Sequence, residues 1–188
     1  RDLLGIVLTH AHEDHIGSVA LIWPELKCKI YATPFTATLL IEKFKEKKID
    51  ISNYLKIVSL NGKVKLGPFD IEFITLTHSI LEPNGLSIKT PEGIVLHTGD
   101  WKCDPNPLIG EKIDEKKLKS LGDQGVIAMI CDSTNIFNEG RAGSESDVRE
   151  SMLRIISNFR KKIIVTSFAS NGARMETIFY RAHETNRQ

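Results

Sequence analysis

Histidines and carboxylates gather at one place near the start of the chain. The string THAHEDH, Thr9–His15, holds three histidines and two acidic residues and directly follows the apolar run Leu3–Leu8. Burying charged groups without a partner is unfavourable, so a buried strand should not end in such a cluster unless a cation balances it. If the chain is extended here, alternate side chains point the same way, until it turns into a helix near Ile16–Gly17. The side chains that would converge are those of His10, His12, Asp14 and His15.

Two further candidate ligands each follow an apolar strand. His78 comes after Ile74–Thr77, and Asp100 comes after Ile94–Gly99. Imidazole nitrogens and carboxylate oxygens suit zinc or manganese, and the lack of cysteine argues against a closed structural zinc site. Side chains delivered by several strand ends to one sheet edge are typical of an open catalytic site. We therefore expect a divalent-metal site at this edge.

Each candidate also has a plainer interpretation. Thr9–His15 could be a solvated turn, His78 an ordinary histidine, and Asp100 a turn aspartate. His97 lies inside a strand pattern, where a structural role or support of a metal ligand is expected. His183 is expected on the surface of the last helix.

Strand-like runs alternate with capped helical patterns along the chain. Helix starts are indicated at Thr33–Pro34, with the pattern running to Lys48, at Ser144 through a capping box, and at Ser170 or Asn171. The turn Pro91–Gly93 predicts a hairpin over Leu86–His97. Strands are expected at Leu3–Leu8, Lys29–Tyr31, Lys56–Leu60, Phe69–Thr77, Leu86–Lys89, Ile94–His97, Val126–Cys131 and Ile163–Thr166. This alternation indicates a mixed, layered α/β fold.

Composition excludes several classes of protein. The 188 residues are 41% apolar and 26% charged, as in an ordinary globular protein, and no apolar run approaches the roughly 20 residues that span a bilayer. The net charge of +1 excludes a uniformly basic surface, so any polyanion site must be a local groove. Three widely spaced cysteines without a CxxC pair fit a reducing, cytoplasmic setting, where we expect buried thiols.

Five strings resemble motifs of a known superfamily. THAHEDHIG at Thr9–Gly17 is similar to the signature motif of the metallo-β-lactamase fold, HTGDWK at His97–Lys102 to its bridging-aspartate motif, and THSILEPNGLSI at Thr77–Ile88 to its intermediate histidine motif. CDSTN at Cys131–Asn135 and TSFASNGARMET at Thr166–Thr177 resemble the β-CASP branch of nucleases. The combination looks most like the bacterial ribonuclease J family. It implies a metallo-β-lactamase αββα sandwich followed by the start of a β-CASP domain.

Carried over position by position, the resemblance implies a role for each candidate. One metal ion would be bound by His10, His12 and His78, a second by Asp14 and His15, with Asp100 bridging them. Asp132 matches an acidic residue placed beside the metal site, and Asp14 and Asp132 are the catalytic candidates; a turn cap is the alternative for Asp132. Leu81 stands where a proline is expected. The candidate substrate contacts are Ser133, Ser170, Asn171 and Arg174, the last three at a strand-to-helix junction of the kind that binds phosphate. For Ser170 and Asn171, simple helix capping is the alternative.

The resemblance implies hydrolysis of RNA phosphodiester bonds, by 5′–3′ exonuclease or endonuclease action, in RNA processing and decay. Two divalent ions, zinc or alternatively manganese, would activate a shared water and clamp an in-line displacement. A small-molecule hydrolase acting on a thioester or lactam is one alternative. A non-catalytic RNA-binding module without metals is another.

The resemblance also implies that this sequence is part of a longer protein. We expect a metallo-β-lactamase domain at 1–143 without its N-terminal strands, and a truncated β-CASP domain at 144–188. A distal histidine that would complete the second metal site is not in this sequence, so we expect weaker binding there and little activity from this part alone. An unpaired sheet edge would favour association between chains, and the longer protein is expected to be a homo-oligomer.

Overall fold

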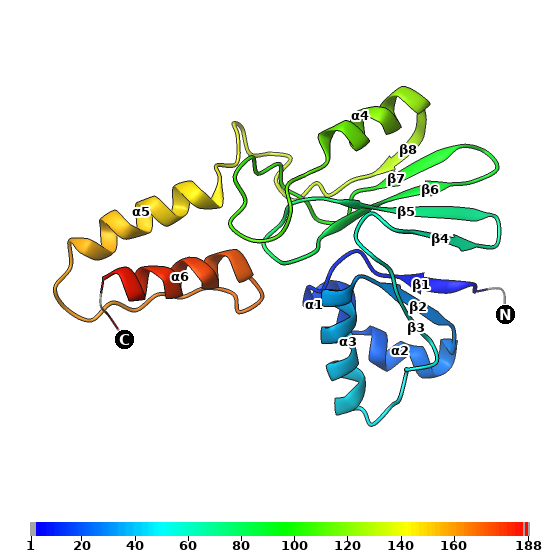
Figure 1. Ribbon diagram of the computed structural model, residues 1–188, viewed down its shortest axis with the longest axis horizontal. Helices are drawn as coiled ribbons and strands as arrows, with labels where there is room; N and C mark the ends of the chain where they lie inside the picture. The colour runs from blue at the N-terminus through cyan, green and yellow to red at the C-terminus, as the bar shows by residue number, and fades with distance from the viewer. Residues whose placement is uncertain (1–2, 186, 188) are drawn as a thin grey trace.

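Two β-sheets and their flanking helices form a four-layer sandwich (Figure 1). The computed structural model describes residues 3–185 and 187, so the outermost ends of both predicted domains, Arg1 and Gln188, lie outside it. Within the described residues, no helix is long and apolar enough to cross a membrane.

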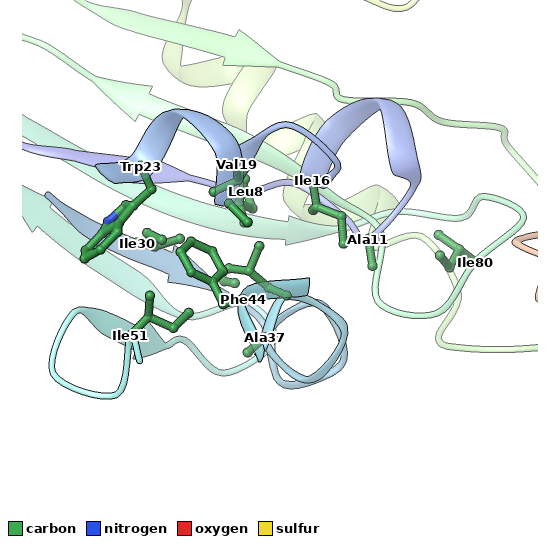
Figure 2. Packing of buried hydrophobic residues seen from close by; sticks show 13 residues of the cluster. Leu8, Ala11, Ile16, Val19, Trp23, Ile30, Ala37, Phe44, Ile51 and Ile80 are labelled. Carbon is green, nitrogen blue, oxygen red and sulfur yellow. The ribbon is translucent and has the colours of Figure 1, made fainter. Parts of the chain in front are cut away.

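The first sheet is parallel and carries the N-terminal motif. Its strands, in spatial order, are β1 (Gly5–Val7), β2 (Lys29–Ala32) and β3 (Leu55–Ile57). The helices connected to it are α1 (Glu13–Ile16), α2 (Val19–Leu26) and α3 (Pro34–Glu46). Buried side chains of α2, α3 and β2, among them Trp23, Phe44 and Ile30, form the core between this sheet and its helices (Figure 2). This core fixes the carboxyl end of β1, from which the motif Thr9–His15 emerges.

The second sheet is largely antiparallel. Its strands, in order, are β4 (Lys63–Leu66), β5 (Phe69–Thr75), β6 (Asn84–Lys89), β7 (Ile94–His97) and β8 (Val126–Ile130), of which only β8 runs parallel to its neighbour β7. The helix α4 (Glu115–Gln124) covers its outer face. Phe73 and Leu86 of this sheet pack with Val7 and Tyr31 of the first, which joins the two sheets.

Two helices, α5 (Glu145–Ser157) and α6 (Gly172–Glu184), lie side by side next to the sandwich (Figure 1). The predicted capping box is confirmed, because the Ser144 hydroxyl and the Asp147 carboxylate each accept a backbone N–H bond at the start of α5. The Asn171 side chain accepts from the Arg174 N–H, so it is Asn171 that caps α6.

The fold confirms the αββα expectation and corrects several local predictions. Ile163–Thr166 forms no strand, because it has no neighbouring strand to pair with and Ile164 is largely exposed. The sequence reasoning missed β4, α2 and α4. The first helix starts at Glu13 rather than near Ile16–Gly17, so the extended stretch ends at His12.

The expectation of buried cysteines is wrong for two of the three. Cys28 is buried, whereas Cys103 and Cys131 are exposed, and all three are free thiols.

Candidate metal centre

Strand ends from both sheets meet at one edge of the sandwich. His10 and His12 follow β1, His78 follows β5 and Asp100 follows β7. One ligand-type atom from each of these four lies within 4.8 Å of the others. The four side chains therefore converge in the structure, as the sequence predicts.

The three imidazoles point their nitrogens at one another. His12 Nδ1 lies 3.1 Å from His10 Nε2 and 3.1 Å from His78 Nε2. The Asp100 Oδ2 lies 3.9 Å from His10 Nε2 and 3.8 Å from His78 Nε2. Ligands at about 2.0–2.2 Å from a tetrahedral zinc ion lie roughly 3.3–3.5 Å apart, so this donor set fits a divalent cation.

A second group shares Asp100. It consists of Asp14, His15 and Asp100, again with ligand-type atoms within 4.8 Å. His15 Nε2 lies 3.3 Å from Asp100 Oδ1 and 3.6 Å from Asp14 Oδ2. The two oxygens of one carboxylate thus face two separate groups of donors. Asp14 belongs to this second group and not with His10 and His12, because it lies in α1 and not on the extended stretch.

Burial keeps the imidazoles of the first group neutral. Desolvation, and then the neighbouring His15, His12 and His78, lower the pKa of His10 to about 2. Burial also lowers the pKa of His12, although the Ser170 backbone and two carboxylates oppose it. The pKa of His78 is lowered by burial and then by His12. Metal binding requires neutral imidazole, so these side chains are in the ligand form at neutral pH.

Asp132 lies near this centre. It follows β8, whose parallel pairing with β7 brings it to the same end of the sheet as Asp100, as expected. The Thr134 hydroxyl and then the Thr134 N–H donate to its Oδ1 and lower the pKa of Asp132, which in turn interacts electrostatically with His78. Asp132 therefore combines a turn-capping contact with proximity to a candidate ligand.

Of the four candidate substrate contacts, one lies beside the metal centre. The backbone of Ser170 lies close enough to His12 to raise the pKa of that imidazole, so the start of the last helix lies beside the centre. Arg174 is instead held by Glu145, with Nη2 3.3 Å from its Oε2, and Asn171 is engaged as a cap. Ser133 is exposed, and its carbonyl accepts from the Ile136 N–H.

Four residues around the ligands escaped the sequence reasoning. The Thr9 hydroxyl lies 3.1 Å from His10 Nδ1, and the Ser79 hydroxyl lies 3.5 Å from His12 Nε2. Thr98 accepts from the Asp132 N–H, and the Thr77 hydroxyl contacts the Lys102 carbonyl. Each lies in one of the sequence motifs, next to or near a candidate ligand. That position could have indicated a supporting role for it. His97 accepts from the Gly99 N–H, which shapes the turn that carries Asp100.

This fold and centre define an αββα protein whose strand ends build a site that fits divalent metal ions. The family model of the metallo-β-lactamase superfamily matches residues 1–130. The chain belongs to that superfamily.

Relatives and one solved structure agree with this assignment. The chain is 40% identical to ribonuclease J of Sinorhizobium meliloti over 100% of this chain and 33% of the relative. It is 39% identical to ribonuclease J of Corynebacterium glutamicum over 97% of this chain and 25% of the relative. A structure from Enterococcus faecalis V583, titled as a protein of unknown function, aligns with a TM-score of 0.63 at 18% identity, covering 98% of this chain and 45% of the other. The predicted resemblance to ribonuclease J is confirmed as sequence similarity, and the chain spans about a quarter to a third of these curated relatives' length.

Proposed function

We propose that this chain carries the metal centre of a ribonuclease that hydrolyses RNA phosphodiester bonds. The observation that carries the proposal is the position of Asp100, whose two oxygens face His10 and His78 on one side and His15 on the other. With one group of donors on each side of Asp100, the site would hold two divalent ions, as a nuclease with a dinuclear centre requires. Zinc fits the nitrogen-rich first group, and manganese is the alternative.

Two divalent ions, when bound, supply a nucleophile at neutral pH and positive charge for the phosphate oxygens. The chain's own residues do the rest. The three neutral imidazoles would hold one ion, and Asp14 with His15 would hold the other. Asp132 is ionised and near His78, where it can orient that imidazole or accept a proton.

The helices α5 and α6 belong, in this proposal, to the beginning of a β-CASP domain at 144–188, after a metallo-β-lactamase domain at 1–143. The proximity of the Ser170 backbone to His12 supports a substrate path between the two parts. Of the four substrate candidates, Ser170 has the strongest support, since Arg174 and Asn171 are engaged elsewhere. The three free cysteines support a cytoplasmic location, and the longer protein is proposed to be a homo-oligomer.

The test uses the protein that contains this chain, loaded with zinc or manganese. It should shorten a 5′-monophosphorylated single-stranded RNA, and Asp100→Ala should abolish turnover. The matched control is Asp123→Ala, an exposed aspartate of α4 whose loss should leave turnover unchanged. Hydrolysis of a thioester or lactam without any cleavage of RNA would instead establish the small-molecule alternative.

A further inference from the structure

A groove lined by lysines opens between the two sheets, at a place the proposed chemistry does not use. It consists of two adjoining hollows of about 400 and 590 Å³, both lined in part by Lys29 and Tyr31. Each hollow is within the usual size range for a small-ligand site. We call this feature the lysine groove, and its lining includes Lys27, Lys29, Lys56, Lys63, Lys65 and Tyr31.

The backbone geometry explains why these side chains face the groove. In β2, Ile30 and Ala32 are fully buried on the helix side, so the alternation of the strand turns Lys29 and Tyr31 toward the second sheet. Lys56 of β3 is the register partner of Tyr31 and shares its face. Parallel strands normally carry apolar residues on both faces. Lysines on this inner face therefore mark a part of the sheet that the second sheet leaves uncovered.

Positive charge is concentrated in the groove. Lys63 and Lys65 pair with Glu72 and Asp70 across β4 and β5, at 3.5 and 3.7 Å. In the part of the chain that the structure describes, Lys27, Lys29 and Lys56 have no carboxylate within ion-pair distance. Among the described residues, five lysines against two carboxylates leave three positive charges here, whereas the whole chain carries +1.

The part of the groove around Lys27, Lys29 and Lys65 lies at the end of the sandwich opposite the metal centre, whereas the part around Lys56 and Lys63 reaches toward the carboxyl ends of β3 and β5. The metal candidates follow the carboxyl ends of β1, β5 and β7, while Lys29 begins β2, which runs parallel to β1. Lys65 stands just before the turn that starts β5. The seven residues of β5 separate these ends by about 20 Å. A phosphate held by Lys29 or Lys65 is therefore not the phosphate that is cleaved.

We propose that the lysine groove binds single-stranded RNA, with phosphates on the lysines and bases against Tyr31 and the half-exposed Tyr54, which lines the same hollow. The choice of RNA rests on the proposed function. Lysines that track a backbone beside aromatic rings are the usual means of binding single strands without regard to sequence. The groove would hold a segment of the substrate remote from the reacting bond. It would raise affinity without changing the chemistry.

The experiment measures binding of the full chain to a fluorescein-labelled single-stranded RNA by anisotropy, in EDTA, so that the metal centre does not contribute. Lys29→Glu with Lys56→Glu should raise Kd at least tenfold at low salt. A control pair with the same change of charge, Lys112→Glu with Lys116→Glu on and before α4, should change Kd less than twofold. Two fewer phosphate contacts should also lower the slope of log K against log salt by about 1.4.

Other outcomes overturn the proposal. Equal losses from both pairs would show that only the overall charge of the chain affects binding, and no loss from the groove pair would show that Lys29 and Lys56 do not contact RNA. Stronger competition by polyglutamate than by RNA would assign the groove to an acidic protein partner. If the charge reversals fail to fold, as judged by circular dichroism, Lys29→Gln with Lys56→Gln gives the same comparison with a smaller expected effect of about threefold.

The cleavage assay is kept separate. Binding that depends on the groove, without any RNA cleavage by the metal-loaded protein, would leave the groove standing and refute the proposed function. Cleavage of RNA by the metal-loaded protein, with unaltered RNA binding in the groove variants, would support the proposed function and refute the role of the groove.

Discussion

Among single residues, Asp100 matters most for the metal centre, because its carboxylate is shared between the two groups of candidate ligands. Asp100 Oδ2 faces His10 and His78, whereas Oδ1 faces His15. His10 is fully buried, while the Asp14 side chain is 76% exposed. The first group is thus better enclosed and has more donors, which should make its affinity for metal the higher of the two.

Metal titration of two histidine variants tests this difference. His78→Ala removes a ligand of the first group and should weaken the tighter binding step more than tenfold. His15→Ala should leave that step in place and abolish the weaker one. Isothermal titration calorimetry with zinc or manganese, together with metal content by mass spectrometry, measures both. Two equally tight steps in the unaltered chain would contradict the asymmetry.

The role of Asp132 can be separated from metal binding in the same way. Asp132→Asn keeps its size but removes the charge that acts on His78. We expect metal content to be retained and the kcat for RNA cleavage by the protein containing this chain to fall at least tenfold. Asp123→Asn, the same change at an exposed aspartate of α4, is the control and should leave kcat within twofold. Loss of metal from Asp132→Asn would instead show a role in assembling the centre.

At the scale of elements, a buried carboxylate attaches α5 to the sandwich. Asp104 Oδ1 accepts from the Ser144 hydroxyl at 2.6 Å, and Oδ2 accepts from the Glu145 N–H at 2.9 Å. The Asp104 N–H in turn donates to the hydroxyl of Thr77, the residue before His78. The start of α5 is therefore coupled through Asp104 to the strand end that carries a candidate ligand.

Asp104→Asn should loosen this attachment. The amide offers one oxygen where the carboxylate offers two, so the Glu145 N–H or the Ser144 hydroxyl loses its acceptor. We expect a loss of about 1–3 kcal/mol in the free energy of unfolding at pH 7, measured with urea. Asp123→Asn, an exposed change in α4, should alter it by less than about 0.5 kcal/mol.

The same residue predicts a dependence on pH. Burial alone would raise the pKa of Asp104, but hydrogen bonds from Ser144, Glu145 and Asn106, helped by Lys102, outweigh it and lower this pKa in the folded protein. A lowered pKa stabilises the folded state fully above the unfolded value of about 3.9, and this contribution is lost as the pH falls through the folded value. Unfolding free energy should therefore drop below about pH 4, and drop less steeply in Asp104→Asn. Parallel curves for the two proteins would contradict this explanation.

At the scale of the whole molecule, the metal centre requires the two sheets to stay in contact, since His10 and His12 come from one sheet and His78 and Asp100 from the other. Phe73 is fully buried between the sheets. Phe73→Ala should lower the free energy of unfolding by about 3–5 kcal/mol and weaken metal binding with it. Phe137→Ala removes a ring that is 96% exposed and should do neither. Urea unfolding and metal titration on both variants make the comparison.

Local features, which depend on residues close together in the chain, follow from the sequence alone. The candidate ligands His10, His12 and His15, the hairpin of β6 and β7 and the capping box at Ser144 could be predicted, because each arises from spacing or hydrogen bonds within a few residues. His78 and Asp100 could be named as well, since each directly follows an apolar strand.

Tertiary structure decided what depends on distant segments. The start of α1 at Glu13 overturned the extended-chain prediction that Asp14 converges with His10 and His12, and left Asp14 in the second group that the resemblance implied. Ile163–Thr166 stayed irregular because a strand needs a partner that its own sequence does not supply. Asp104 meets Ser144 across 40 residues, and the lysine groove forms only where two sheets diverge. These contacts depend on how the sheets and helices are placed in space, which no local pattern of residues specifies.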